Sequence, residues 1–110
     1  MDNIKSDDYH VCKIKEDLYF IVDKMRDVNM EELTLNEVLL DSMMFRLIQI
    51  SENANRLSDE YKNNHANIPW VAIYGLRNRI VHDYGNVDLD IIFSTLKYDI
   101  PDLLECIENE

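Results

Sequence analysis

The spacing of apolar residues near the N-terminus constrains the fold more than any other feature of the chain. From Asp7 to about Val28, apolar residues recur every three or four positions, which places them on one face of a helix. The chain holds only two Gly and two Pro in 110 residues, so few positions interrupt a helix. The pattern predicts an all-α protein whose first helix spans these residues. The apolar positions are Val11, Ile14, Leu18, Ile21, Val22 and Met25.

A second helix is predicted to begin at Thr34 and to run to about Leu57. Thr34 and Glu37 have the spacing of a capping box, with Thr34 as the N-cap. This helix is apolar around most of its circumference, which indicates two surfaces to bury. Either the helix has a core face and a dimer face, or it is buried in a single core rich in Met. The apolar residues are Leu35, Val38, Leu39, Leu40, Met43, Met44, Phe45, Leu47, Ile48 and Ile50.

The second half of the chain carries signals for two further helices. The polar segment 58–67 is predicted to be a loop, and Pro69 suits the start of a third helix from Trp70 to about Tyr84. Gly85 can end this helix in left-handed backbone geometry. Asp88 can cap a fourth helix whose inward residues are Leu89, Ile92, Phe93, Leu96 and Ile100.

Pro101 should kink or restart this last helix, because proline lacks the backbone donor that a helix interior needs. The expected fold is therefore an antiparallel up-and-down bundle of four helices, with room for a short extra helix after Pro101. A chain of 110 residues can enclose one core, so residues 1–110 are predicted to form a single domain.

The net charge of −11 argues against a protein that holds nucleic acid by bulk electrostatics. Residues 46–82 are the exception, with five basic and three acidic side chains. An anionic substrate should therefore meet the middle of the chain.

The two cysteines, Cys12 and Cys106, lie far apart in the sequence, which favours reduced thiols over a disulfide between the termini. No apolar run approaches the roughly 20 residues that span a bilayer, so we expect a cytoplasmic protein without membrane contact. The cysteines, His10 and His65 show no metal-ligand spacing, and no metal or other cofactor is expected.

Arg77 interrupts the apolar stripe of the third predicted helix. On a helical wheel the large apolar and aromatic residues of this segment lie within about 60° of it. Burying a guanidinium without a partner is costly, so either Arg77 pairs with a buried carboxylate such as Glu52, or the stripe opens onto a cleft for a phosphate. The surrounding residues are Trp70, Ile73, Tyr74, Ile80, Val81 and Tyr84.

Three neighbours of Arg77 are further candidates. Asn78 and His82 are four residues apart on one helix face, so the amide could orient the imidazole, although a histidine near a helix C-terminus is often only a favourable dipole contact. Tyr84 follows Arg77 by seven residues and by default would be a core or interface aromatic.

The second predicted helix also carries a polar stripe at spacings of three and four. If this stripe faces the third helix, it extends the positive surface around Arg77; otherwise it is a solvated face. Its members are Arg46, Gln49, Asn53 and Arg56.

Arg77, four residues, His82, one residue and Tyr84 form a motif that resembles that of the HepT-like toxins of the HEPN superfamily. The flanking sequence resembles them too, over roughly residues 35–107. The similar stretches are Arg46-Leu-Ile-Gln-Ile-Ser-Glu-Asn-Ala, Leu57-Ser, Ile68-Pro-Trp70-Val-Ala-Ile-Tyr-Gly-Leu-Arg-Asn and Pro101-Asp-Leu-Leu.

The resemblance implies an antiparallel helical bundle that forms a homodimer, with one motif from each subunit lining a shared cleft. It also implies metal-independent endoribonuclease activity on RNA. His82 would then act as general acid or base, and Arg77 would stabilise charge on the transition state. Asn78 would orient His82. Arg79, Arg46 and Arg56 are weaker candidates for RNA contact.

The resemblance further implies a type VII-like toxin–antitoxin module. Its MntA-like nucleotidyltransferase antitoxin would transfer AMP to the motif tyrosine, here Tyr84. Two alternatives remain open. One is a non-catalytic helical module that binds and positions a partner nucleotidyltransferase, and the other is a plain dimeric bundle in which Arg77 is structural.

Overall fold

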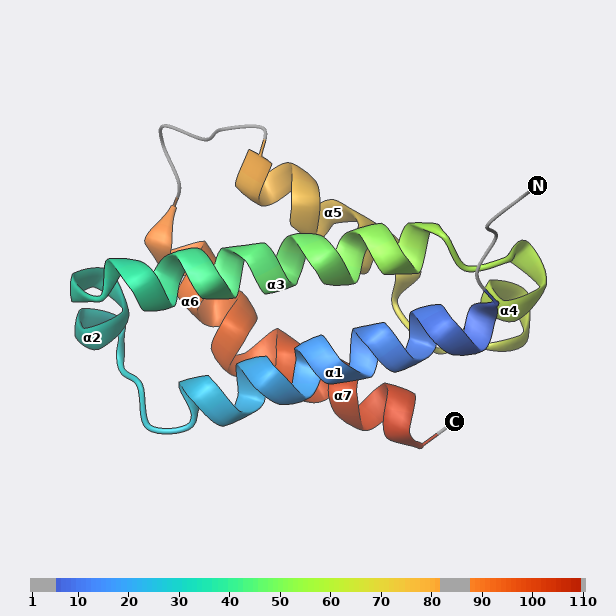
Figure 1. The fold of residues 1–110 in the computed structure, drawn as a ribbon, viewed down its shortest axis with the longest axis horizontal. Coiled ribbons are helices and arrows are strands. Elements are labelled where there is room, and N and C mark those ends of the chain that lie inside the picture. Colours follow the sequence, from blue (N-terminus) through green and yellow to red (C-terminus); the bar gives the residue numbers. More distant parts are fainter. Residues whose placement is uncertain (1–5, 82–87, 110) are drawn as a thin grey trace.

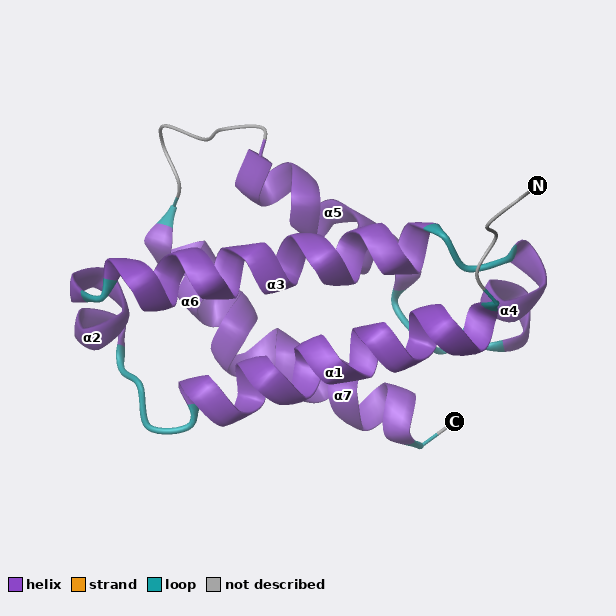
Figure 2. Ribbon diagram, viewed as in Figure 1, coloured by secondary structure: helices purple, strands orange, loops and turns teal. Residues whose placement is uncertain are grey.

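The computed structural model describes residues 6–81 and 88–109, apart from the side chains of Arg79 and Val81. Every regular element in these ranges is helical, which confirms the all-α class (Figures 1 and 2). The α-helices are α1 (Asp7–Met25), α2 (Met30–Leu35), α3 (Glu37–Asn55), α4 (Asp59–Asn64), α5 (Trp70–Val81), α6 (Leu89–Ser94) and α7 (Ile100–Glu108), with a π-helical turn over Thr95–Asp99 between the last two. The short helices α2 and α4 are additional to the four helices that the sequence predicted.

The boundary between α2 and α3 differs from the prediction that Thr34 is an N-cap. Thr34 lies inside α2, and its hydroxyl donates to the carbonyl one turn earlier at 2.8 Å. The capping box belongs to Asn29 and Glu32, whose side chains each accept from the other's backbone N–H, at 2.8 and 3.3 Å. Asn36 caps α3 by accepting from a backbone N–H at 3.0 Å. Asparagine caps a helix as well as threonine does, so two nearby caps divide the expected helix.

The polar segment 58–67 contains a helix where a loop was predicted. Ser58 is the N-cap of α4 and accepts from the backbone N–H of Tyr61 at 3.0 Å. Ser58 also donates to Asp7 at the start of α1, from its backbone N–H at 2.8 Å and from its hydroxyl at 2.6 Å. These bonds tie the two helix starts together across 51 residues of sequence.

Helix α3 lies at the centre of the fold and packs against α1 on one side and α5 on the other (Figure 1). The two surfaces that its composition requires are therefore buried within one chain. A third side of α3, together with the end of α2, stays open: Leu35, Val38 and Phe45 are 77%, 80% and 57% exposed. The buried apolar residues of the long helices are Ile14, Leu18, Ile21 and Met25 from α1, Met43, Leu47, Ile50 and Ala54 from α3, and Ile73, Leu76 and Ile80 from α5.

The C-terminal part follows the sequence prediction closely. Asp88 caps α6, with its carboxylate accepting from the backbone N–H groups of Asp90 and Ile91 at 3.0 and 3.3 Å. The helix then widens into the π-helical turn and restarts as α7, with Pro101 in its first turn. Proline lacks a backbone N–H, and here it directly follows the wider π-helical turn, in which the Ile100 N–H donates to the Thr95 carbonyl. Ile92, Leu96 and Ile100 are buried as expected, and Leu89 and Phe93 are half-buried.

Lys97, in the π-helical turn, fixes this C-terminal unit to the end of α1. Its Nζ donates to the carbonyls of Met25, Arg26 and Val28 at 2.7, 3.3 and 2.9 Å. Carbonyls at a helix C-terminus lack helical donors and carry partial negative charge, so an ammonium is well matched to them.

Both cysteines are free thiols, with Cys12 exposed and Cys106 half-buried. None of the helices in residues 6–81 and 88–109 has the length and apolar character that crossing a membrane requires.

Candidate functional site at the α3–α5 junction

Arg77 lies on the rim of the buried face of α5. The buried residues of this helix are Ile73, Leu76 and Ile80, whereas the Arg77 side chain is 51% exposed. The prediction that Arg77 lies at the middle of the apolar stripe is therefore wrong, because the buried residues lie to one side of it. Tyr74 and Trp70 are only half-buried, so the apolar stripe of α5 is more exposed than its large aromatic residues indicate.

Glu52 on α3 is the carboxylate partner of Arg77. Nε of Arg77 lies 2.8 Å from Oε1 of Glu52 in an ion pair, and the Glu52 side chain is 35% exposed. Of the two alternatives, pairing with Glu52 is thus present, but the pair is open to solvent. A guanidinium has five N–H donors in a planar fork, and its approach to Glu52 is through Nε. The donors on the two terminal nitrogens can serve an oxyanion without breaking the pair.

A polar hollow of about 300 Å³ surrounds this ion pair. Its walls come from α3 and α5, which the Ser51 hydroxyl links by donating to the Tyr74 carbonyl at 3.3 Å. Lys62 of α4 lies with its Nζ 5.2 Å from the centre of the Tyr74 ring, which brings a second cation beside the hollow. The lining residues are Ser51, Glu52 and Asn55 from α3 and Tyr74, Arg77 and Asn78 from α5.

This arrangement is chemically suited to a phosphodiester. Arg77 supplies a fixed positive charge and planar donors, and the amides of Asn55 and Asn78 can donate to or accept from sugar and base groups. Sequence reasoning placed Arg77, Asn78 and Glu52 here but missed Ser51 and Asn55. Their signal was present, because positions 51, 52 and 55 share the helix side that meets α5.

The polar stripe of α3 faces α1 and not α5. Arg46 donates from Nη1 to Oδ1 of Asp17 at 2.8 Å, and its guanidinium lies 3.8 Å from the centre of the Phe20 ring. Burial raises the pKa of the Asp17 carboxyl, and the Arg46 hydrogen bond opposes that shift. Nδ1 of the buried His10 donates to Oδ1 of Asn53 at 2.9 Å. The hypothesis that this stripe extends the positive surface around Arg77 is therefore wrong for Arg46 and Asn53.

The remaining candidates are placed only in part. Arg56 is exposed at the C-terminal end of α3. His82, Tyr84 and Gly85 lie outside the described residues, as does the side chain of Arg79. Among the residues that the structure describes, no three His, Cys, Asp or Glu side chains come close enough together to hold a metal ion.

Comparison with known proteins places the whole motif within one match. The family described as Ribonuclease HepT-like matches residues 14–110. A protein of Caldanaerobacter subterraneus subsp. tengcongensis, named "Putative RNase TTE0752", is 28% identical over 82% of this chain and 80% of its own length. "Probable ribonuclease HepT" of Thermococcus cleftensis is 27% identical, with 82% of each chain covered. No solved structure was found to match the chain.

Proposed function

Because the chain belongs to the Ribonuclease HepT-like family, we propose that it is a metal-independent endoribonuclease and the toxin of a type VII-like toxin–antitoxin module. The observation that carries the proposal is the polar hollow around Arg77, on the helix that leads into the motif. The family match spans this hollow and the motif residues that follow it. The names of the two relatives point to the same reaction class.

The proposed reaction is an internal transesterification of RNA. The ribose 2′-oxygen attacks phosphorus, the bond to the 5′-oxygen breaks, and the products are a 2′,3′-cyclic phosphate and a 5′-hydroxyl. His82 removes the 2′ proton or protonates the leaving oxygen. Arg77 donates to the phosphoryl oxygens as charge builds on them, and Asn78 orients His82. Lys62, Arg56 and Arg79 supply weaker contacts to the RNA backbone.

A homodimer would complete this site. The open side of α3 offers exposed Val38 and Phe45, together with Leu35 at the end of α2, as an apolar surface for a second copy. Exposed apolar residues that gather on one side of a helix are typical of association surfaces. Two copies meeting along α3 and α5 would bring two Arg77 motifs to one cleft, which concentrates cationic side chains there although each chain carries a net charge of −11.

Regulation is proposed to act through Tyr84. An MntA-like nucleotidyltransferase would transfer AMP to the Tyr84 hydroxyl, two residues from His82. The added group is bulky and anionic, so it would block the cleft and repel RNA. The alternative, a non-catalytic module that positions such a transferase, has no need of both Arg77 and His82.

Cleavage of a defined RNA by the purified protein in the presence of EDTA tests the proposal. Wild type should cut the RNA and leave cyclic phosphate ends, whereas His82→Ala should remain folded and lose cleavage. Arg26→Ala is the matched control, because Arg26 is an exposed arginine at the far end of α1. Cleavage that persists in His82→Ala, or that EDTA abolishes, would contradict the mechanism. Intact mass of the protein, measured first, reveals whether an AMP group is already attached.

A further inference from the structure

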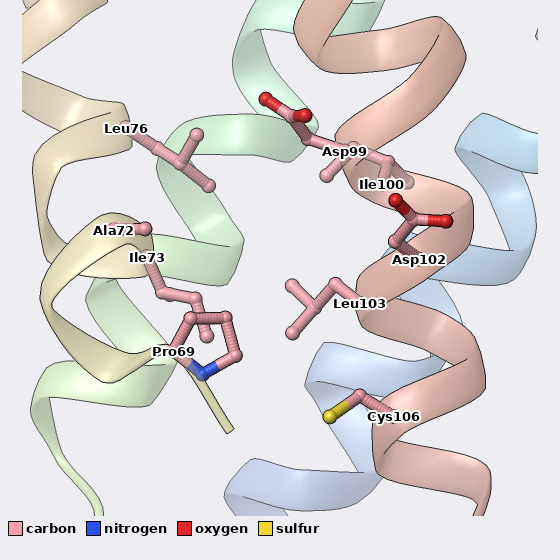
Figure 3. A pocket seen from close by; sticks show the side chains of 9 residues that line it. All are labelled: Pro69, Ala72, Ile73, Leu76, Asp99, Ile100, Asp102, Leu103 and Cys106. Carbon is pink, nitrogen blue, oxygen red and sulfur yellow. The ribbon is translucent and has the colours of Figure 1, made fainter. Parts of the chain in front are cut away.

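An apolar groove lies on another side of α5 from Asn78. A groove of about 400 Å³ runs between α5 and the start of α7. Its floor is formed by Ala72, Ile73 and Leu76 from α5 and by Ile100 and Leu103 from α7 (Figure 3). On a helical wheel Ala72 and Leu76 lie about 100° or more from Arg77 and Asn78, whereas Ile73 lies about 40° from Arg77. The groove and the polar hollow therefore occupy different sides of one helix.

A second hollow lies beside this groove, along α6. It measures about 480 Å³ and shares Asp99 with the first. Ile91, which is 48% exposed, adds an apolar side chain to this part. The two hollows are therefore neighbours that share one lining residue, and we call them together the α5–α7 groove.

Carboxylates line the rim of the α5–α7 groove. Asp99 and Asp102 stand at the edge of the apolar floor, on the α7 side (Figure 3). Asp90 adds a third acidic side chain in the hollow along α6. Among the described residues that line the two hollows, none is Lys or Arg.

We propose that the α5–α7 groove binds a basic amphipathic helix of a protein partner. An apolar floor between two helices accepts the apolar stripe of a third, as ridges fit into grooves. The acidic rim requires Lys or Arg on both flanks of that stripe. Nucleic acid is unsuited to this site, because its phosphates would meet three carboxylates.

Charge also argues against a second copy of this chain in the groove. If two copies met groove to groove, Asp90, Asp99 and Asp102 of one copy would face the same carboxylates of the other. A partner with a basic helix gains both apolar burial and attraction, and it would contact α5 without covering Arg77. A partner bound in the groove would therefore contact α5, the helix that carries Arg77, and would leave the polar hollow open.

The probe for this proposal is a synthetic amphipathic helix of Leu and Lys, compared with a Leu/Glu helix of the same pattern and with a scrambled Leu/Lys peptide. Binding to the full chain is measured by fluorescence anisotropy, and methyl NMR locates the site. The amphipathic Leu/Lys peptide should bind at least about tenfold more tightly than either control, a difference that the apolar stripe and the rim charges can supply. It should shift the methyl signals of Ala72, Leu76 and Leu103.

Asp102→Lys tests the rim, and Glu31→Lys is its control. Both residues are exposed carboxylates in the first turn of a helix, so the two changes alter net charge and helix-end electrostatics alike. Asp102→Lys should weaken binding about tenfold, and Glu31→Lys less than about threefold. Ala72→Trp, at an exposed position, fills the groove without changing charge and should weaken binding as well.

Three outcomes would overturn the proposal. Equal weakening by Asp102→Lys and Glu31→Lys would mean that general attraction to an acidic protein explains the binding. Unchanged methyl signals at the groove floor would place the peptide elsewhere. A change of oligomeric state caused by Asp102→Lys or Ala72→Trp would mean that the groove is an interface between copies of this chain. Circular dichroism of each variant confirms that the comparison is made on folded protein.

Discussion

The carboxylate of Glu52 on α3 holds Nε of Arg77 on α5 at 2.8 Å, in a pair whose side chains are 35% and 51% exposed. The central helix of the fold thereby sets the direction of the cation that, among the described residues, lines the polar hollow. A guanidinium held in advance loses less rotational freedom when a phosphate arrives. Glu52 is therefore a positioning residue in the proposed reaction.

Replacing Glu52 separates positioning from binding. Glu52→Gln keeps an acceptor for Arg77 Nε, whereas Glu52→Ala removes it. We expect kcat for RNA cleavage to fall about tenfold in Glu52→Ala and less in Glu52→Gln, with KM nearly unchanged, because misdirecting one donor costs part of its transition-state stabilisation. Steady-state kinetics on a defined RNA checks this order. Glu60→Ala, an exposed glutamate on α4, is the control, and equal rates in all four proteins would remove Glu52 from the mechanism.

Arg77→Ala should affect cleavage far more than stability. A solvent-exposed ion pair contributes about 0–1 kcal/mol, so urea unfolding should change by less than about 1 kcal/mol. Loss of a cation that stabilises charge in the transition state should reduce kcat about 10²–10³-fold. The measurements are urea denaturation and RNA cleavage on the same preparation. A destabilisation of several kcal/mol would instead assign Arg77 to the fold, as the plain-bundle alternative requires.

Asn53→Ala should destabilise the protein through His10. The two side chains share a 2.9 Å hydrogen bond between α1 and α3, and they are 4% and 6% exposed. Removing the amide leaves a buried ring nitrogen without its acceptor, which costs about 1–3 kcal/mol. Urea unfolding measures this cost. Asn55→Ala, two positions along α3 and exposed, should change stability by less than about 0.5 kcal/mol. Similar losses in both variants would mean that the His10 bond contributes little.

Asp7 makes stability depend on pH at the junction of α1 and α4. The hydroxyl and backbone N–H of Ser58 donate to this carboxylate and hold its pKa below the usual value of 3.8. A lowered pKa in the folded state means that the stabilisation is fully present above about pH 4 and is lost as the pH falls through the lowered value.

Thermal unfolding of wild type and Asp7→Asn across this range tests the dependence. The gap between their melting temperatures should be widest above about pH 4 and should close as the pH falls toward 2. Asp8→Asn removes a carboxylate from the same helical turn but leaves both Ser58 bonds in place, so its gap should not follow this course. A gap that widens toward low pH would contradict the sign of the shift.

Local signals in the sequence predicted most of the helices. The apolar spacing of α1, the cap at Asp88 and the restart at Pro101 each depend on residues close together in the chain, and the structure confirms them. The prediction of Thr34 as an N-cap was wrong because Asn29 and Asn36 lie nearby and are the N-caps instead. Capping residues of similar strength cannot be ranked from sequence. Segment 58–67 was too polar to suggest a helix, yet Ser58 caps one and Asp7 stabilises that cap from α1.

The sequence predicted several residues of the candidate site, but not which helices pack against them. A helical wheel shows which α3 positions share a side, but it does not show which neighbouring helix that side meets. The sequence therefore left two alternatives for Arg46 and Asn53, facing α5 or facing solvent, whereas Asp17 and His10 place them against α1. The sequence left open whether Arg77 pairs with a buried carboxylate or faces a cleft, because burial depends on what packs over its large apolar neighbours. Trp70 and Tyr74 are only half covered.

Expression of wild type and His82→Ala without any partner tests the central claim most directly, with growth and RNA integrity scored in the same cultures. The account predicts that wild type arrests growth and fragments RNA. His82→Ala, at equal soluble level and in the same oligomeric state, should do neither, and the control Arg26→Ala should behave as wild type. If His82→Ala arrests growth and fragments RNA as wild type does, the ribonuclease assignment is wrong. If wild type leaves RNA intact while its measured mass shows no added AMP, the chain is not the active toxin proposed here.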